Sequence, residues 1–293
     1  MSVNSNFESF CNNLRISDNK ISDIRNRYHQ ITKRINIDYW TTSSDTNHSL
    51  YVGSYGRGTE IFTSDIDMVV ELPYATYKKF NERSGNGQSD LLQEVKNVLK
   101  KTYSSSDLKG DGQIISIKFS DGINFEILPC FINNDGKSYT HADSNNGGAW
   151  RITNPRAEID EINSLNKSTN KNLKRLCRMA RAWKDNCNVP ISGILIDTLA
   201  YKFLKTWEYK DKGYIYYDWM SRDFFKYLKN IDKTQVKWLV PGSNRYISEY
   251  GNFQNKAAIA YNKSLEAIEY EDKECPYSAK SKWREIYGTK FPS

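Results

Sequence analysis

The stretch of sequence that decides the fold reads GSYGRGT at residues 53–59 and SDID at residues 64–67. It follows a short candidate strand at residues 49–52 and leads into DIDMVVEL at residues 65–72, a second candidate strand rich in β-branched and apolar residues. Its glycines permit a tight turn, in which backbone N–H groups and the Ser54 hydroxyl form a cradle for phosphate oxygens. The stretch therefore predicts a phosphate-binding turn between two strands.

Asp65 and Asp67 are two residues apart on the second candidate strand, so their side chains project from the same face. Carboxylates placed in this way hold hard divalent cations, and Mg²⁺ commonly binds one or two carboxylates together with substrate phosphates. Two metal ions ~3.5–4 Å apart stabilise both the attacking and the leaving oxygen of a phosphoryl or nucleotidyl displacement. The aspartates therefore predict a site for two Mg²⁺ ions, with Mn²⁺ as the alternative.

A third acidic residue, Glu126, lies in a candidate strand over residues 123–132. An Asp-Gly turn joins this strand to another candidate strand at residues 113–119, which is a strong hairpin signal. The neighbours Phe125 and Ile127 face the other way, and a charge inside an apolar strand costs free energy unless it is paired or bound to a metal. Glu126 is therefore the candidate third carboxylate, and an edge-strand residue that faces water is the alternative.

The composition excludes several classes of protein. The chain has 293 residues, 26% of them charged, and a net charge of +7, which argues against disorder and favours anionic partners without requiring them. No stretch approaches the ~20 apolar residues of a transmembrane helix, and the first residues lack a signal-peptide pattern. Five scattered cysteines without a CxxC pair make a disulfide framework or a structural zinc site improbable and point to the cytoplasm. With three histidines, carboxylates are expected to carry any catalysis.

The pattern of apolar residues predicts two lobes. Helical spacing over residues 7–40 is followed by the candidate strands, a polar loop over residues 79–88 and an amphipathic helix near residues 91–99. After about residue 155, helical periodicity dominates to the end of the chain. We therefore expect a mixed α+β lobe with its N-terminal helix over residues 1–155, and a helical lobe over residues 156–293.

Together these features resemble the polymerase-β-like nucleotidyltransferase superfamily. Three further segments resemble its cyclic GMP-AMP synthase-like branch, the CD-NTase enzymes of bacterial anti-phage signalling. They are FEILPCF at residues 125–131, GGAWRITNP at residues 147–155, and LKRLCRMARAWK at residues 173–184. The resemblance covers roughly residues 50–205. It implies a nucleotidyltransferase lobe with a small mixed sheet, a helical lobe after it, and an active site in the cleft between them.

The resemblance also implies a mechanism. Asp65 and Asp67 hold Mg²⁺ on a donor triphosphate, and Glu126 helps to activate the hydroxyl of an acceptor nucleotide. This hydroxyl attacks the α-phosphate in line, pyrophosphate leaves, and a later round closes a ring. The glycine-rich turn implies nucleotide contacts from Gly53, Ser54, Arg57 and Thr59.

The third of these segments lies within a basic run. Seven positive charges follow one another with no acid between them, at Lys167, Lys171, Lys174, Arg175, Arg178, Arg181 and Lys184. Arg178, Arg181 and Lys184 are expected to offset triphosphate charge, with a solvated helix face as the alternative reading. By the resemblance, Arg181 stands where a triphosphate-binding lysine is usual, and Ser192 matches a residue that contacts the γ-phosphate or, alternatively, caps a helix.

The sequence departs from the family pattern in three places. The third acid is Glu126 where Asp is commoner, Gly193 replaces a frequent base-stacking aromatic, and no ligand-sensor domain is recognisable. These departures leave the metal geometry, the stacking of the donor base and the regulation open.

Three functions compete. The first is an Mg²⁺-dependent synthase that makes a cyclic di- or trinucleotide second messenger from NTPs; a downstream effector binds the product, and a nucleic acid or a protein is the candidate activator. The second is a template-independent transferase that makes linear oligonucleotides or modifies RNA, DNA or protein. Charge reversal of Lys171, Lys174 and Arg175 separates these two, because only a long acceptor needs an extended basic groove. The third is a catalytically silent nucleotide-binding sensor, which the presence of all three carboxylates disfavours.

Overall fold

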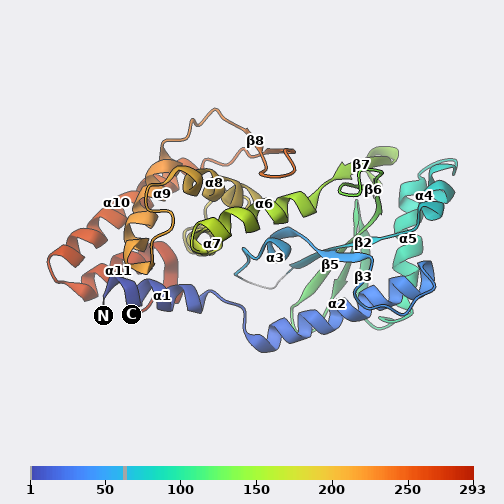
Figure 1. Ribbon diagram of the computed structural model, residues 1–293, viewed down its shortest axis with the longest axis horizontal. Coiled ribbons are helices and arrows are strands. Elements are labelled where there is room, and N and C mark those ends of the chain that lie inside the picture. Colours follow the sequence, from blue (N-terminus) through green and yellow to red (C-terminus); the bar gives the residue numbers. More distant parts are fainter. Residues whose placement is uncertain (1, 62–64) are drawn as a thin grey trace. The chain divides into compact units, whose positions relative to one another are not determined.

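The computed structural model describes residues 2–61 and 65–293 (Figure 1). Ser64 of the SDID motif lies outside the described residues. The chain divides into two compact units: unit 1 contains residues 1–15, 58–61 and 160–293, and unit 2 contains residues 16–57 and 62–159.

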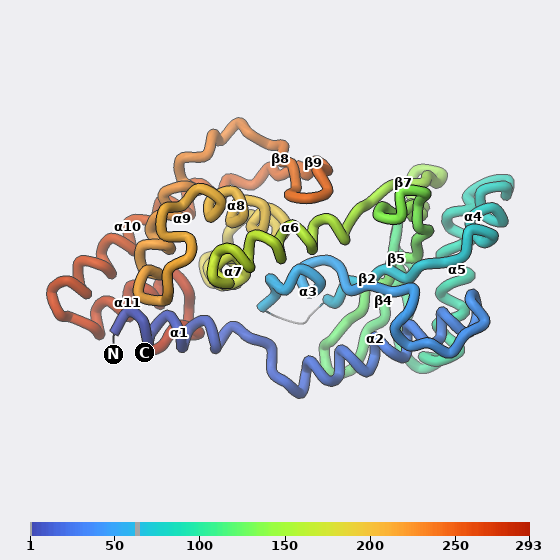
Figure 2. Tube along the Cα trace, viewed as in Figure 1, coloured from blue at the N-terminus to red at the C-terminus, as the bar shows by residue number. Residues whose placement is uncertain are grey.

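Unit 2 is built on a sheet whose described strands follow the order β1-β2-β5-β4-β3, with β6 pairing with β5 and β7 pairing with β6. Strands β2 and β5 are parallel and lie side by side in the trace (Figure 2), whereas the other pairs are antiparallel. The strands are β1 (Ser49–Tyr51), β2 (Asp65–Glu71), β3 (Asp107–Asp111), β4 (Ile114–Lys118), β5 (Asn124–Ile132), β6 (Tyr139–Asp143) and β7 (Ala149–Thr153).

One face of this sheet is covered by helices. Helices α2 (Asp18–Tyr39) and α5 (Gly87–Lys100) share an apolar core with Ile66, Met68 and Val70 of β2. Because side chains alternate along a strand, the residues between these three point to the opposite face. The remaining helical segments of this unit are α3 (Gly53–Arg57), α4 (Tyr74–Asn81), the 3₁₀ turn η1 (Asn145–Gly147) and the first residues of α6 (Pro155–Ser168).

Unit 1 is mainly helical. Its core contains Trp183, Phe225 and Trp283, and the N-terminal Phe7 and Phe10 are fully buried in it. Helix α1 therefore belongs with the C-terminal helices, although the sequence grouped it with the mixed lobe. The elements are α1 (Val3–Asn13), most of α6, α7 (Asn172–Cys187), α8 (Gly193–Thr206), η2 (Tyr214–Tyr216), α9 (Tyr217–Lys229), β8 (Lys237–Leu239), β9 (Tyr246–Ser248), α10 (Phe253–Asp272), α11 (Pro276–Tyr287) and η3 (Gly288–Lys290).

The predicted strands over residues 49–52, 65–72, 113–119 and 123–132 are confirmed to within one or two residues. Two other predictions, one of a helix and one of a loop, need correction. The helix expected over residues 7–40 is interrupted after Asn13, where Leu14 caps α1 and Ser17 precedes α2. The polar loop expected over residues 79–88 includes the end of α4 and the start of α5. Strands β3, β6, β7, β8 and β9 were not predicted, because they have only three to five residues each, too few for a clear alternation of apolar and polar side chains.

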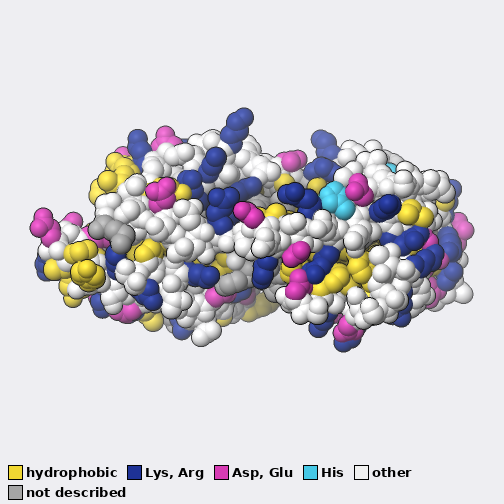
Figure 3. Space-filling view, turned by 90° about the horizontal axis from the view of Figure 1, so that it is seen from below, with side chains coloured by type: hydrophobic (Ala, Val, Ile, Leu, Met, Phe, Trp, Pro, Cys, Tyr) yellow, Lys and Arg dark blue, Asp and Glu magenta, His cyan; other side chains and the backbone are white. Residues whose placement is uncertain are grey.

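No helix among the described residues is long and apolar enough to cross a membrane. Lys and Arg side chains are interspersed with Asp and Glu on the face that Figure 3 shows, as the modest net charge suggests.

Two acids of unit 1, the buried Asp218 and the half-buried Glu271, make its stability depend on pH. Burial raises the pKa of Asp218 to about 6 and that of Glu271 to about 7, and an oxygen of each carboxyl has no hydrogen-bond partner among the described residues. Since both carboxyls bind a proton more tightly in the folded state, the free energy of unfolding falls as pH rises from about 4 to about 7.

We expect Asp218→Asn to remove part of this dependence. The neutral amide avoids burying a charge, so the variant should be about 1–3 kcal/mol more stable than the wild type at pH 8 and show little gain at pH 4. Urea unfolding of both proteins at the two pH values measures the difference. An equal effect of the substitution at both pH values contradicts the prediction.

Candidate active site

The three predicted carboxylates lie on two adjacent parallel strands. Asp67 of β2 is the register partner of Glu126 of β5, and Asp65 is the partner of Asn124. All four lie on the sheet face opposite to the one that α2 and α5 cover, because their neighbours Ile66, Met68, Phe125 and Ile127 form that covered core. The sheet therefore brings together acids that are about 60 residues apart in the sequence.

Asp67 and Glu126 are half-buried and close enough to share a hydrogen bond. Burial raises the pKa of both carboxyls, and the charges of Asp67 and Asp65 help to raise that of Glu126 to about 7. The Arg57 guanidinium acts in the opposite direction on Asp67. Two carboxylates that repel each other in this way are stabilised by a shared proton or a cation.

Asp65 is exposed at the start of β2, and its Oδ1 accepts a hydrogen bond of 3.2 Å from Asn124 Nδ2. In residues 2–61 and 65–293, no three His, Cys, Asp or Glu side chains are placed so that they could already hold a metal ion. The donor set nevertheless fits a hard divalent cation, because it consists of carboxylate oxygens with mutually repelling charges on one sheet face.

Gly53 provides the space for Asp67. Its φ is +59°, and a Cβ atom at this position would lie 1.7 Å from Asp67 Oδ2. Backbone hydrogen bonds fix the approach, since Val52 N donates to Asp67 O and Gly56 N donates to Val52 O. The first glycine of the motif is therefore required both for the left-handed turn and for the position of the carboxylate.

We expect Gly53→Ala to lower kcat/KM by about 100-fold or more, because the added Cβ displaces the Asp67 carboxylate from its place. Gly136 provides a matched control, since its φ is +64° and nothing lies within 4 Å of a Cβ built there. Gly136→Ala carries the same backbone strain without the clash and should keep near-normal activity. Steady-state kinetics of both variants, with circular dichroism to confirm folding, test the prediction. Similar activities for the two variants contradict it.

The other residues of the glycine-rich turn differ in exposure. Ser54 is half-buried in α3, directly after Gly53. Arg57 is buried and lies 3.4 Å from Glu158 Oε2 in the same unit. This ion pair holds the guanidinium near Asp67. The positive charge of Arg57 partly offsets the effect of burial on the pKa of the Asp67 carboxyl, so the structure favours a positioning role for Arg57.

Thr59 and Arg181 belong to a buried polar network in unit 1. Arg181 Nη1 and Nη2 lie 2.5 Å and 3.0 Å from the two Asp197 oxygens, and Thr59 Oγ1 donates to Asp197 Oδ2 over 2.8 Å. Arg181 Nη2 also donates to the Gly193 carbonyl, and a Cβ built at Gly193 would lie 3.2 Å from this arginine nitrogen. A side chain at position 193 would therefore crowd the Arg181 guanidinium.

The remaining predicted contacts are also in unit 1. Arg178 donates to the Glu60 carbonyl and forms an ion pair of 3.4 Å with its side chain. Ser192 is the N-cap of α8 and accepts a hydrogen bond from Leu195 N, which confirms the capping alternative and leaves its γ-phosphate contact a prediction. Lys184 lies in the last turn of α7.

Three acids that hold the predicted cations in place, Glu60, Glu158 and Asp197, were not predicted from the sequence. For Asp197 a signal existed, because it is a single charge inside the apolar run ILIDTLA at residues 194–200. A buried charge requires a partner, and the basic helix before it supplies one. Glu60 and Glu158 lie in segments whose burial only the tertiary structure reveals.

Comparison with known proteins connects this geometry to a family. Residues 1–166, more than half of the chain, match the Second Messenger Oligonucleotide or Dinucleotide Synthetase domain. A probable cyclic nucleotide synthase of Bacillus cereus (strain VD146) is 26% identical over 277 residues, covering 82% of this chain and 81% of that protein.

Solved structures share the fold. CdnC of Escherichia coli MS115-1, solved with ATP, matches with a TM-score of 0.65 at 15% identity, covering 99% of each chain. CdnG of Bradyrhizobium diazoefficiens, a CD-NTase solved with GTP, has a TM-score of 0.65 at 10% identity, covering 98% of this chain and 95% of that one. The predicted α+β polymerase-β-like fold is thereby confirmed. The chain belongs to the Second Messenger Oligonucleotide or Dinucleotide Synthetase family, the cyclic GMP-AMP synthase-like branch of these enzymes, and is a nucleotidyltransferase.

Proposed function

We propose that this nucleotidyltransferase condenses NTPs into a cyclic di- or trinucleotide and releases pyrophosphate. The observation that supports this reaction most directly is the pairing of Asp67 with Glu126 in the parallel register of β2 and β5, with Gly53 in contact with Asp67. Family membership supports the class of product.

The proposed cofactor is Mg²⁺, with Mn²⁺ as the alternative and two ions per site. Asp65, Asp67 and Glu126 are the residues that would hold it. When bound, such cations neutralise the charge that develops on the phosphate oxygens. The three carboxylates lie on adjacent strands of one sheet. In this proposal, their positions determine where the cations neutralise charge.

In each round, the hydroxyl oxygen of the acceptor nucleotide forms a bond to the α-phosphorus of the donor. The bond from this phosphorus to the bridging oxygen breaks, and pyrophosphate leaves with the electron pair. Glu126 is the proposed group that assists removal of the hydroxyl proton. Gly53 and Ser54 are proposed to contact the triphosphate, with Arg57 and Thr59 supporting them from buried positions.

From unit 1, the proposed nucleotide contacts are Arg178, Arg181, Lys184 and Ser192. Arg181 is held by Asp197, so its role in this proposal is to position a charge near the triphosphate. NTP substrates agree with neighbours of the same fold that were solved with ATP or GTP.

We further propose that the enzyme works in the cytoplasm in anti-phage signalling, with a protein or nucleic-acid activator and a separate effector that binds the product. CdnC of Escherichia coli MS115-1 was solved in a complex with HORMA-deltaN, which supports a protein activator for a chain of this fold.

A product assay tests the proposed reaction. The purified protein is incubated with all four NTPs and Mg²⁺, treated with phosphatase, and the surviving products are identified by mass spectrometry. An Asp65→Ala/Asp67→Ala double variant is the control. We expect a phosphatase-resistant cyclic product that is absent from the control. A ladder of linear products instead favours the transferase alternative. The absence of pyrophosphate release favours the silent-sensor alternative, and the same cyclic product from the control variant contradicts the assignment of Asp65 and Asp67.

A further inference from the structure

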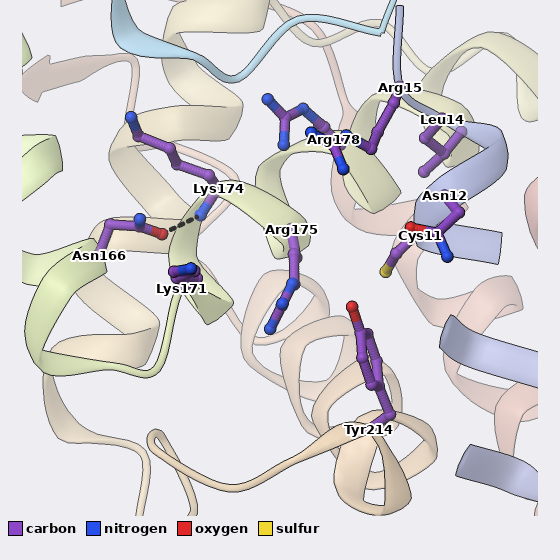
Figure 4. Close-up of a pocket in the computed structure, with 10 residues that line it drawn as sticks. All are labelled: Cys11, Asn12, Leu14, Arg15, Asn166, Lys171, Lys174, Arg175, Arg178 and Tyr214. Atoms are coloured by element: carbon purple, nitrogen blue, oxygen red, sulfur yellow. Dashed lines mark hydrogen bonds between the residues drawn. The ribbon is translucent and has the colours of Figure 1, made fainter. Parts of the chain in front are cut away.

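Unit 1 contains a strongly basic pocket that the proposed reaction does not explain. It is a cavity of about 280 Å³, at the lower end of the range of roughly 300–1,000 Å³ that is usual for small-molecule sites. Figure 4 shows how side chains from α1, α6, α7 and η2 surround it. Its lining residues are Cys11, Asn12, Leu14, Arg15, Asn166, Lys171, Lys174, Arg175, Arg178 and Tyr214.

Five of these lining residues are cations and none is an acid. Within the part of the chain that the structure describes, one of these five cations forms an ion pair, namely Arg178 with Glu60. Arg175 has neutral partners, the Asn170 carbonyl, the Tyr217 hydroxyl and the face of the Tyr214 ring. Burial raises the pKa of the Cys11 thiol to about 12, so this group is neutral as well. The pocket therefore carries an excess of positive charge.

The arrangement is unfavourable for the helix that carries it. Lys171, Lys174 and Arg175 lie at the N-terminal end of α7, where the helix dipole favours negative charge, and no acid lies in the first turn. Pairs of like charge at spacings of three and four residues add repulsion. Burial, followed by the charge of Arg178, lowers the pKa of Lys174. A bound anion relieves all of these costs at once.

The residues that line the pocket differ from the carboxylates proposed for the reaction. Its lining residues all lie in unit 1, whereas the carboxylates lie in unit 2. Arg178 is common to the pocket and to the proposed triphosphate contacts, but Arg181, Lys184 and Ser192 do not line the pocket. Along α7, Arg175 and Lys184 are nine positions apart, about 2.5 helical turns, and project from opposite sides, whereas Lys174, Arg178 and Arg181 lie near one face.

We propose that this pocket binds a small ligand that carries two or more phosphate groups, at a site other than the carboxylate site. Five convergent cations around one compact cavity match several closely spaced negative charges. The half-buried Tyr214 ring and the buried Leu14 form an apolar side of the same cavity. A single compact cavity favours a small ligand over the long backbone of a nucleic acid.

Inorganic tripolyphosphate is the probe for this proposal. Its binding is measured by isothermal titration calorimetry at low ionic strength and without divalent cations, because salt screens exposed charges. The protein is the Asp65→Ala/Asp67→Ala variant, so the measurement does not depend on the proposed reaction. In this background, Arg15→Gln/Lys171→Gln removes two exposed lining cations. Lys226→Gln/Lys237→Gln removes two exposed cations of the same unit that do not line the pocket.

We expect the pocket variant to bind tripolyphosphate at least about tenfold more weakly than the control variant, because each lost charge removes a charge-assisted hydrogen bond. Equal affinities in the two variants overturn the proposal. A short DNA duplex is tested as a competitor. The small-ligand assignment is also overturned if the duplex binds more tightly than tripolyphosphate, displaces it, and loses affinity in the Arg15→Gln/Lys171→Gln variant. Failure of the product assay leaves these outcomes unaffected.

Discussion

Asp67→Asn is expected to lower kcat by about 1,000-fold or more without unfolding the protein. The substitution keeps the shape of the side chain but removes the charge that is proposed to hold the divalent cation. Charge stabilisation of this kind contributes several kcal/mol, and each 1.36 kcal/mol corresponds to about tenfold in rate. Folding should be preserved, because burial already raises the pKa of Asp67 and disfavours its charge. Pyrophosphate release under saturating NTP and Mg²⁺ measures the effect.

Glu71→Gln is the matched control for this variant. Glu71 lies on the same strand and the same face as Asp67, is also half-buried, and pairs with Cys130 rather than with an acid. Its neutralisation should leave turnover within a few fold of the wild type. Titration with Mn²⁺ adds a measurement besides activity, and weaker binding is expected for Asp67→Asn alone. If Asp67→Asn keeps near-normal turnover, Asp67 is not a catalytic ligand.

The second large effect concerns stability. Asp197→Ala leaves the Arg181 guanidinium buried without its carboxylate, and it also removes the acceptor of Thr59 Oγ1. Removing one partner of a buried ion pair typically costs about 3–5 kcal/mol, a large part of the total stability of a domain. We expect a corresponding loss in the free energy of unfolding, measured with urea at neutral pH.

The double variant Arg181→Met/Asp197→Leu separates charge burial from simple loss of packing. Because it removes both charges and retains apolar volume, it should recover most of the stability that Asp197→Ala loses. If the double variant is as unstable as the single one, the unpaired guanidinium is not the cause. If Asp197→Ala unfolds at the same urea concentration as the wild type, the pair does not stabilise unit 1.

Much of the strand pair that carries the candidate catalytic residues could be predicted from the sequence. The run DIDMVVEL alternates so that Ile66, Met68 and Val70 are buried on one face, and this alternation by itself places Asp65 and Asp67 on the other. The same argument placed Glu126 between Phe125 and Ile127. Strand periodicity is a local property, so a single sequence reveals which side chains share a face.

The residues that position these groups could not be predicted in the same way. The N-terminal helix was assigned to the mixed lobe, because its amphipathic pattern shows that it packs but not against which partner. In the structure, Phe7 contacts Trp283 and Phe291, which lie near the other end of the sequence. Arg178, Arg181 and Lys184 of the basic run were predicted to offset triphosphate charge, with a solvated helix face as the alternative. In the structure Arg181 is buried against Asp197, and Lys171, Lys174 and Arg175 line the pocket of unit 1.

The sequence by itself therefore determined the candidate residues for the chemistry, which are a glycine-rich turn and three carboxylates on two strands, and it indicated the nucleotidyltransferase family to which the chain belongs. Only the tertiary structure decided which charges are paired, which are left to bind an anion, and that Gly53 makes room for the Asp67 carboxylate. The reason is physical. Spacing along one strand or helix fixes the direction of a side chain, whereas the partner that neutralises a buried charge comes from a distant segment that packing alone brings near.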